Sequence, residues 1–410
     1  MNYLIIGNGI AGISAAEAIR RQDVHGTITM VAAENSLPYC RPMISSVLEG
    51  TISEDQLPIR SSNFYDELRI RPVLDERVVA IDLDTRTVST AAGLIIPFDR
   101  LLIATGADPR SVAVPGSGLQ HIFPLRSLTH VQKMLTIVPQ VHRAVVLGGG
   151  LVGFKAAYAL LRRGLHVSMV IGSAYPLAMQ VDETAGHMIL HELQNHGLRI
   201  LVGSQVHAFA GHAKVNAVAL ADGTELPCEL VVVGKGVAPA CKFISADRIA
   251  VNQGIVVNEH LETSFPGIYA AGDVAELVDL ARRCRFLNAI WPEAVDQGIA
   301  AGMNMAGRPV CYRGSVSRNV IRIFSLDVMT AGLVAPPADD KRYTIISSLM
   351  PRRRQYRKMV FCDDRLVGMI LINDIAQGGV LFSLIRRGLP LTIPKEKLLD
   401  STFQVRSLLW

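Results

Sequence analysis

The sequence predicts an α/β fold with two Rossmann-like domains and a C-terminal α+β domain. Three observations carry this prediction. A short apolar run, a G-x-G-x-x-G turn and a helical segment occupy residues 4–21, and the same order returns at residues 145–163. From about residue 317 the pattern changes to alternating strands followed by a helix. Apolar runs too short for helices suit buried parallel strands, so the first two segments indicate βαβ units.

The first glycine motif, Gly7-Asn-Gly-Ile-Ala-Gly12, lies between a predicted strand and a predicted helix at 13–21. One glycine allows the tight turn, one lets a pyrophosphate approach the backbone, and one lets the helix lie against the strand. The helix N-terminus directs free N–H groups at the phosphates. After the next strand, at 28–31, Glu34 is placed to accept a hydrogen bond from a ribose hydroxyl. The motif predicts a bound dinucleotide; a glycine turn that binds nothing is the alternative.

The composition narrows the class of protein. A length of 410 residues suits two or three domains, and a net charge of +5 is too mild to imply nucleic acid, for which no motif occurs. No apolar run reaches about 18 residues, so no membrane-spanning helix is expected. The chain begins in a strand without a basic n-region, so we expect no secretion signal.

Six cysteines are scattered along the chain, with no C-x-x-C and no cluster spacing. This argues against a redox dithiol, a zinc or other metal site and a protein-ligated iron–sulfur cluster. Scattered thiols fit a reducing compartment, so we expect the protein in the cytoplasm.

Between the two glycine motifs, an irregular segment at 37–46 contains two prolines. Its Arg41 could pair with a phosphate or a ribose edge, or be a solvated loop arginine. Residues 77–103 show the alternation of a β-meander that returns to a buried strand at 101–104. That strand ends in Thr105-Gly106, a small polar turn that could touch the same ligand.

The second cycle repeats this order. The motif Gly148-Gly-Gly-Leu-Val-Gly153 precedes a helix at 154–163, a meander spans about 205–233, and Val231-Val-Val-Gly-Lys-Gly236 mirrors the earlier strand and glycine turn. An internal duplication is the simplest explanation. Two glycine-rich phosphate sites imply two dinucleotides.

A further buried strand, at 268–271, ends in Gly272-Asp273, where ligands of open α/β sheets bind. Asp273 can accept hydrogen bonds from a polyol chain. A helix at 292–306 follows Trp291, and its positive end could stabilise negative charge on a ring system.

The predicted C-terminal domain contains the basic run Pro351-Arg-Arg-Arg-Gln-Tyr-Arg-Lys358. Such a run is usually a solvated face. The functional interpretation is a docking patch for an acidic partner, where charge speeds the encounter.

Four motifs, at 7–12, 104–106, 148–153 and 269–273, occur in the order that resembles the FAD-dependent pyridine nucleotide–disulfide oxidoreductase superfamily. Pro38-Tyr-Cys-Arg-Pro42, Trp291 and the C-terminal domain are similar to the branch of NAD(P)H:rubredoxin and ferredoxin reductases and nitrite-reductase flavin domains. The chain also resembles the flavoproteins associated with carbon monoxide dehydrogenases.

The resemblance implies FAD in the first domain and NAD(P)H in the second. It implies domains at 1–112 with 246–316 (FAD), at 113–245 (NAD(P)) and at 317–410 (an α+β interface domain). The implied FAD-site residues are Gly7, Gly9, Ile10, Ala11, Gly12, Glu34, Asn35, Arg41, Pro42, Val79, Ala104, Thr105, Gly106, Arg126, Gly272, Asp273 and Trp291. The implied NAD(P)-site residues are Gly148, Gly150, Leu151, Val152, Gly153, Ser173, Gly234 and Gly236.

Three departures from the superfamily matter. Where members often carry an acidic residue after the second strand of the nicotinamide domain, this chain has Ile171-Gly-Ser173, so NAD or NADP preference is open. Where members pair a lysine with a glutamate near the flavin, this chain has Ser46 and Lys155, and we hypothesise that Lys155 supplies the positive charge. A lysine lying along the helix surface is the alternative.

The third departure is the missing dithiol, because Cys40 has no partner cysteine in sequence. Cys40 could form a sulfenate, as in peroxidases, or be a plain thiol beside the FAD.

These observations predict an FAD-dependent NAD(P)H oxidoreductase that passes single electrons to a ferredoxin- or rubredoxin-like iron–sulfur protein. The alternatives are an NADH oxidase or peroxidase that uses Cys40, and a flavin-bearing electron-transfer subunit of a larger complex. A homodimer is left open.

Overall fold

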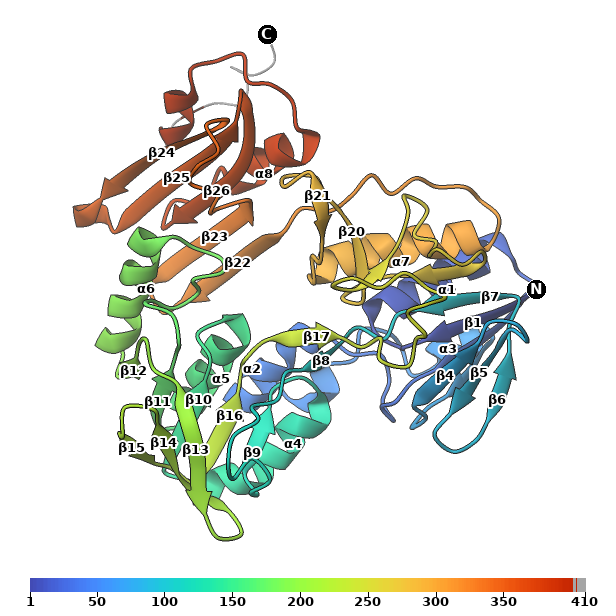
Figure 1. Ribbon diagram of the computed structural model, residues 1–410, viewed down its shortest axis with the longest axis horizontal. Helices are drawn as coiled ribbons and strands as arrows, with labels where there is room; N and C mark the ends of the chain where they lie inside the picture. The colour runs from blue at the N-terminus through green and yellow to red at the C-terminus, as the bar shows by residue number, and fades with distance from the viewer. Residues whose placement is uncertain (401–402, 404–410) are drawn as a thin grey trace. The chain divides into compact units, whose positions relative to one another are not determined.

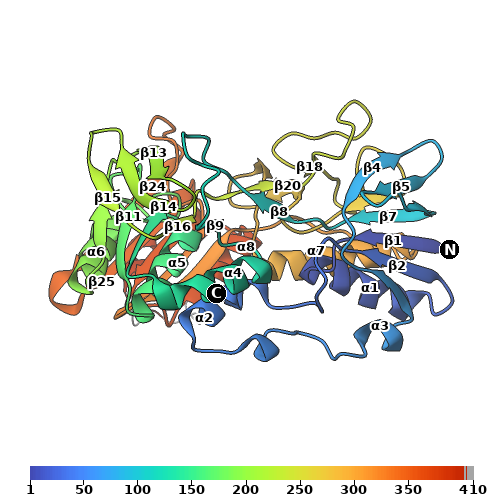
Figure 2. The same cartoon turned by 90° about the horizontal axis from the view of Figure 1, so that it is seen from below.

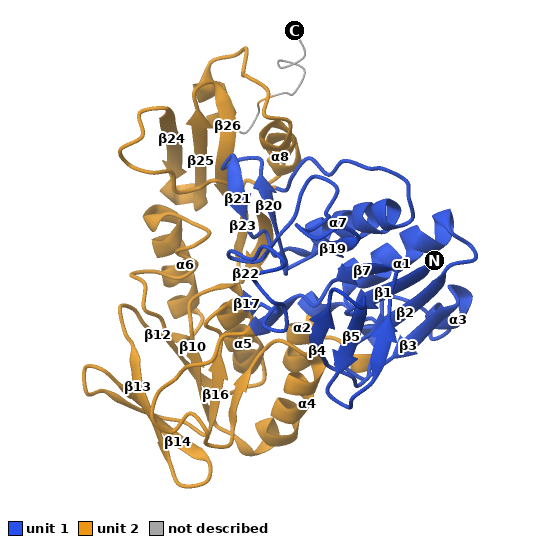
Figure 3. Ribbon diagram, turned by 45° about the vertical axis from the view of Figure 1, so that its right-hand side comes forward, with its two compact units in different colours: residues 1–42, 55–108, 238–315 blue, residues 43–54, 109–237, 316–410 orange. Residues whose placement is uncertain are grey.

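The computed structural model describes residues 1–400 and 403 and divides the chain into two compact units (Figure 3). Unit 1 comprises residues 1–42, 55–108 and 238–315; unit 2 comprises residues 43–54, 109–237 and 316–410. Unit 2 thus contains both the second glycine motif and the C-terminal sheet. The three domain boundaries expected from the sequence stay a prediction.

Unit 1 is built on a five-stranded sheet of order β19-β7-β1-β2-β3, in which every neighbouring pair is parallel. Side chains of the central strands, such as Leu4, Ile5 and Leu102, are fully buried. Strands covered on both faces read as continuous apolar runs, which is why the period-2 pattern is absent here. The strands are β1 (Asn2–Ile6), β2 (Thr27–Val31), β3 (Ile70–Val73), β7 (Arg100–Ile103) and β19 (Ile268–Ala270).

Helices α1 (Ile10–Gln22) and α7 (Trp291–Met305) lie side by side in unit 1 (Figures 1 and 2). Their backbones approach closely because α7 presents two glycines to α1. A Cβ on Gly298 would lie 2.2 Å from the Ala11 carbonyl oxygen, and one on Gly302 would lie 2.4 Å from the Ala15 carbonyl oxygen. This contact fixes α7 against the helix that follows the first glycine motif.

The predicted meander is confirmed as a three-stranded antiparallel sheet in unit 1, and a second small sheet contains the strand that follows Gly272. The remaining elements of unit 1 are α3 (Phe64–Glu67), β4 (Val78–Asp82), β5 (Thr87–Thr90), β6 (Ile95–Pro97), β18 (Ile255–Val256), β20 (Ala275–Asp279) and β21 (Cys284–Phe286). Two of the boundaries between the units fall within β8 (Ala107–Pro109) and β17 (Val237–Pro239).

Unit 2 repeats the same construction, with a parallel sheet of order β12-β11-β10-β16-β9 and an antiparallel meander. The sheet strands are β9 (Ile122–Pro124), β10 (Arg143–Leu147), β11 (His166–Val170), β12 (Arg199–Leu201) and β16 (Leu230–Val233), and the meander strands are β13 (Val206–Gly211), β14 (Val215–Leu220) and β15 (Glu225–Pro227). The helices are α2 (Ile44–Glu49), α4 (Leu128–Ile137), α5 (Leu151–Arg162) and α6 (Glu183–Asn195).

The C-terminal part of unit 2 is an antiparallel sheet of order β22-β23-β26-β25-β24 with α8 beside it (Figure 1). This confirms the expected α+β construction. Its elements are β22 (Arg318–Ile323), β23 (Leu326–Gly332), β24 (Tyr343–Met350), β25 (Gln355–Cys362), β26 (Arg365–Ile372) and α8 (Gly378–Arg387).

Among the described residues, no helix is both long enough and apolar enough to cross a membrane.

Replacing Gly298 with alanine should destabilise the protein, because the new methyl group would collide with a backbone carbonyl that has little room to move. We expect a loss of about 2 kcal/mol in the free energy of unfolding, which is typical of overpacking. Gly379→Ala is the control, because that helical glycine has nothing within 4 Å of its Cβ position. Urea unfolding followed by circular dichroism measures both variants. Equal stability of the two would contradict the close approach of α7 to α1.

Candidate functional site

The first glycine motif forms a tight turn in the positive-φ region. Gly7 has φ of +110°, and a Cβ there would lie 2.3 Å from the Ala104 carbonyl oxygen. A Cβ on Gly12 would lie 2.0 Å from the Gly7 carbonyl oxygen, whereas nothing lies within 4 Å of the Cβ position of Gly9. Two glycines are therefore required by packing, and the middle one faces open space where a ligand can approach.

The second glycine motif has the same geometry. Gly148 has φ of +113° and its Cβ position lies 2.3 Å from the Gly234 carbonyl oxygen; that of Gly153 lies 2.0 Å from the Gly148 carbonyl oxygen. Again nothing lies within 4 Å of the Cβ position of the middle glycine, Gly150. The near identity of the two turns supports the inferred duplication.

Each turn leads into a helix whose first N–H groups have no side-chain cap. Gly9 is the N-cap of α1 and Gly150 is the N-cap of α5, and neither helix has an acidic residue in its first turn. These helix ends keep unpaired donors and a positive dipole for a phosphate group. Ile10 and Ala11 begin α1, and Leu151 and Val152 begin α5, as expected for residues at the two phosphate sites.

Glu34, Arg41 and Tyr39 form a polar cluster in unit 1. The Arg41 guanidinium pairs with Glu34 Oε1 at 2.6 Å, and the Tyr39 hydroxyl donates to Glu34 Oε2 at 2.7 Å. Burial would lower the pKa of Arg41, but the negative charges of Glu34 and Asp273 contribute to a net rise. The structure thus pairs two predicted site residues, Glu34 and Arg41, and the charge of a third, Asp273, acts on Arg41. Arg41 is therefore an ion-paired residue rather than a solvated one.

Ser36, in the segment that follows Glu34, has a buried hydroxyl oxygen without a hydrogen-bond partner among the described residues. Asn8, inside the first glycine motif, donates to the Ser36 carbonyl oxygen at 2.9 Å. Asn35 lies between Glu34 and this serine. A polar ligand at the glycine turn would satisfy the hydroxyl, which fits the adenosine end of a dinucleotide.

The strand ends of unit 1 are arranged around the same turn. Thr105 donates its hydroxyl proton to the Ala240 carbonyl oxygen at 2.7 Å, so only its lone pairs stay available to a ligand. Gly106 and Gly272 have φ of +70° and +81°. The Gly272 N–H donates to Gln297 Oε1 of α7 at 2.7 Å, which fixes the turn that carries Asp273.

Trp291 is the first residue of α7, and Pro292 follows it in the first turn, where proline is favoured. The first turn also holds Glu293, a buried carboxylate that accepts a hydrogen bond from the Tyr312 hydroxyl. Burial and this carboxylate both raise the pKa of Tyr312. The sequence did not indicate that a buried carboxyl group lies at this helix end, because its partner Tyr312 is 19 residues away in the chain.

The positions of four other predicted site residues do not indicate a ligand. Pro42 lies in a 3-10 turn, and Val79 is an exposed side chain of β4. Cys40 is partly exposed and forms no disulfide, and its N–H donates to the Leu57 carbonyl oxygen at 2.9 Å. Arg126 follows β9 and belongs to unit 2.

The residues that follow β11 carry no charge up to Asp182. Ile171 is fully buried, and the Ser173 hydroxyl donates to the Tyr175 carbonyl oxygen at 2.7 Å. Ser173 therefore keeps only acceptor capacity for a ribose hydroxyl. Neither a carboxylate nor a cation stands at the position expected to distinguish NAD from NADP.

Lys155 lies on α5, and α5 contacts α2, the short helix that carries Ser46. The Arg163 side chain after α5 donates to the Leu48 carbonyl oxygen at 2.8 Å. Residue 46 and residue 155 thus lie on contacting helices of unit 2, and the role of Lys155 near the flavin stays a prediction.

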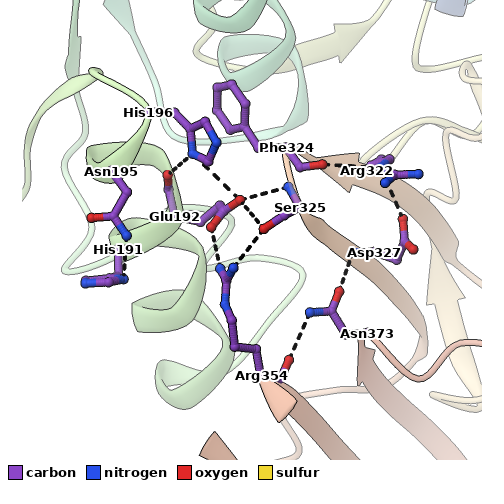
Figure 4. A network of polar contacts seen from close by, with 10 residues as sticks. All are labelled: His191, Glu192, Asn195, His196, Arg322, Phe324, Ser325, Asp327, Arg354 and Asn373. Atoms are coloured by element: carbon purple, nitrogen blue, oxygen red, sulfur yellow. Dashed lines mark hydrogen bonds and ion pairs between the residues drawn. The ribbon is translucent and has the colours of Figure 1, made fainter. Parts of the chain in front are cut away.

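The C-terminal sheet is joined to α6 through a buried carboxylate, Glu192 (Figure 4). Glu192 Oε1 accepts hydrogen bonds from the Ser325 N–H at 2.8 Å and the Ser325 hydroxyl at 2.7 Å, and Oε2 pairs with Arg354. Burial alone would raise the pKa of Glu192, but these donors outweigh it and hold the pKa below its usual range. His196 stacks on Phe324 beside this group, with ring centroids 3.8 Å apart.

A second carboxylate, Asp182 at the N-cap of α6, extends the contact. It accepts a hydrogen bond from the Tyr356 hydroxyl at 2.7 Å and pairs with Lys358 at 3.0 Å. Arg357 is also buried and pairs with Asp374 at 2.7 Å. Three of the five cations of the basic run, Arg354, Arg357 and Lys358, therefore make internal ion pairs, whereas Arg352 and Arg353 are exposed.

Among the described residues, no group of three or more His, Cys, Asp or Glu side chains could hold a metal ion.

Comparison with known proteins agrees with this geometry. Residues 1–298 match the family model described as "Pyridine nucleotide-disulphide oxidoreductase", and residues 318–389 match "Rubredoxin NAD+ reductase C-terminal domain". The chain is 30% identical to the "Assimilatory nitrate reductase electron transfer subunit" of Bacillus subtilis, with 97% of this chain covered but only 51% of that protein. The chain therefore spans about half the length of this relative.

Another relative has nearly the same length. The "NADH-dependent phenylglyoxylate dehydrogenase subunit epsilon" of Aromatoleum evansii is 30% identical over 95% of this chain and 92% of its own. A solved putidaredoxin reductase–putidaredoxin complex superimposes with a TM-score of 0.90 and 26% identity, covering 99% of this chain and 97% of that one.

Glu192→Gln should weaken the attachment of the C-terminal sheet to α6, because it leaves Arg354 without its counter-charge. We expect a loss of about 2 kcal/mol in the free energy of unfolding at pH 7. The pKa of Glu192 is depressed in the folded state, so its stabilisation is present above the ordinary carboxyl pKa and fades as the pH falls below it. The difference from the wild type should therefore shrink toward pH 3.

Glu183→Gln on the same helix is the control, because the Glu183 side chain is 82% exposed. Chemical unfolding at pH 7 and pH 3 measures all three proteins. A Glu192→Gln variant as stable as the control at pH 7 would show that the buried carboxylate does not hold the sheet.

Proposed function

The chain belongs to the pyridine nucleotide-disulphide oxidoreductase family, and from this premise we propose that it is an FAD-dependent NAD(P)H oxidoreductase that reduces an iron–sulfur protein. When bound, FAD would accept a hydride from the nicotinamide and release electrons singly to the acceptor. The observation that carries the proposal is the pair of matching glycine turns, each opening an uncapped helix. Among the described residues, no dithiol accompanies them.

The first turn is the proposed FAD site. Open space at Gly9, the unpartnered Ser36 hydroxyl and the acidic and basic pair Glu34–Arg41 all fit a dinucleotide with an adenosine ribose. Asp273 would bind the ribityl chain or the pyrophosphate, and Trp291 with the start of α7 would lie by the flavin ring. The second turn is the proposed nicotinamide dinucleotide site.

The C-terminal domain supports an iron–sulfur acceptor, because it matches a domain described for rubredoxin reductases. The similar complex with putidaredoxin supports the same kind of partner. Exposed Arg352 and Arg353 could attract an acidic acceptor, whereas Arg354 is held by Glu192. A homodimer and a cytoplasmic location stay predictions.

Two further roles are proposed from the sequence departures. Lys155 would place a positive charge near the flavin, where it would favour the reduced, anionic ring. Cys40 is the residue on which the rival function depends, an NADH oxidase or peroxidase. The second alternative is a flavin-bearing electron-transfer subunit of a larger complex. The relative of about twice this length, itself described as an electron transfer subunit, supports this alternative.

Cys40→Ser separates the first rival from the proposed function. NADH-dependent reduction of a ferredoxin or rubredoxin, measured without oxygen, should be unchanged, because electron transfer needs no thiol. The rival predicts instead that peroxide turnover is lost in this variant. Cys311→Ser, at an exposed free cysteine, is the control. Loss of acceptor reduction in Cys40→Ser alone would contradict the proposal.

Glu34→Gln should weaken FAD binding, because the amide is a poorer acceptor for the ribose hydroxyl and no longer pairs with Arg41. We expect the dissociation constant to rise about tenfold, which corresponds to about 1.4 kcal/mol. Fluorescence of released flavin measures it. Glu67→Gln, at an exposed residue of α3, is the control. An unchanged affinity of Glu34→Gln for FAD would show that Glu34 does not contribute to the FAD site.

A further inference from the structure

Lys235 lies at the edge of the second glycine turn. It stands between Gly234 and Gly236, just after β16, whose four residues are all buried. A Cβ on Gly148 would meet the Gly234 carbonyl oxygen at 2.3 Å and the Lys235 backbone nitrogen at 3.3 Å. The lysine therefore borders the turn from which α5 begins. The sequence motif contained this lysine, but only the flanking glycines were expected at the site.

The ammonium group of Lys235 has no counter-charge. No hydrogen bond or ion pair of its side chain occurs within residues 1–400 and 403. The residue is half-buried, and burial lowers the pKa of the ammonium with no carboxylate acting against it. By contrast, the buried Lys358 of the C-terminal sheet is paired with Asp182. Partial burial of a cation without an anion is unfavourable, so a bound anion would stabilise Lys235.

The surroundings of Lys235 also favour an anion. Helix α5 has no acidic residue in its first turn and no side chain capping its first N–H groups. The loop at 172–181 contains neither aspartate nor glutamate. The positive end of α5 and the lysine charge therefore act together without a nearby carboxylate from either segment.

The sheet order decides which anion is within reach. In the sheet, β10 lies between β11 and β16. The glycine turn follows β10, Ser173 follows β11, and Lys235 follows β16. In such folds, the residue that contacts the ribose hydroxyl distinguishing NAD from NADP follows the second strand, here β11. Lys235 lies on the opposite side of the turn, beside the place where the pyrophosphate meets the helix end.

Building on the proposed function, we propose that Lys235 binds the pyrophosphate of the nicotinamide dinucleotide as a charged partner to the N-terminus of α5. The contact requires a positive charge rather than a particular side-chain shape. It treats NAD and NADP alike, because both carry the same pyrophosphate.

The test uses Lys235→Met and Lys235→Arg in the oxidised holoprotein, with Lys214→Met at an exposed lysine of unit 2 as the control. Calorimetric titration with NAD⁺, NADP⁺ and ADP-ribose measures binding without any turnover. We expect Lys235→Met to raise the dissociation constant of all three about tenfold, while Lys235→Arg stays close to the wild type. Added salt should weaken binding less in Lys235→Met than in the wild type.

Several outcomes would overturn the inference. An unchanged affinity in Lys235→Met would do so, and a loss confined to NADP⁺ would place the lysine at the 2′-phosphate instead. A loss for NAD⁺ but not for ADP-ribose would place it at the nicotinamide. If the wild type binds none of the three ligands, the proposed function fails instead, so the two failures are distinguishable.

Discussion

The close approach of a strand, a glycine turn and a helix is the constraint on which the structure depends. In each unit, the first glycine of the motif adopts a positive φ and lies against a carbonyl oxygen from a neighbouring strand, where no Cβ would fit. The last glycine lets the helix lie over the turn. As a result, the helix N–H groups and the open face of the middle glycine meet at one point, where a pyrophosphate can bind.

The two sites differ in what surrounds this shared turn. Around the first, Glu34, Arg41 and Asp273 form a charged cluster, and a serine hydroxyl has no partner among the described residues. Around the second, the loop at 172–181 carries no charge, and the Lys235 ammonium has no counter-charge among the described residues. A duplicated backbone has therefore acquired different recognition chemistry in each copy, as two different dinucleotides would require.

The sequence predicted the features that depend on local backbone rules. Glycine spacing, buried apolar runs and meander alternation indicated both parallel sheets and the family resemblance, which the comparisons confirm. Side-chain partners far apart in the chain were out of reach: Arg354 and Glu192 are 162 residues apart, so the basic run looked wholly exposed. The helix after the first motif begins at Ile10, earlier than expected, because the glycine turn itself supplies its N-cap.

The central claim is that one chain holds one FAD and reacts with one reduced pyridine dinucleotide. Anaerobic titration of the purified yellow protein with NADH, followed by absorbance, tests it most directly. The account predicts that the flavin absorbance is bleached at one equivalent of dinucleotide per FAD, with NADPH as the parallel titrant. Protein that carries no flavin and cannot be reconstituted with FAD, or flavin that neither dinucleotide bleaches, would contradict it.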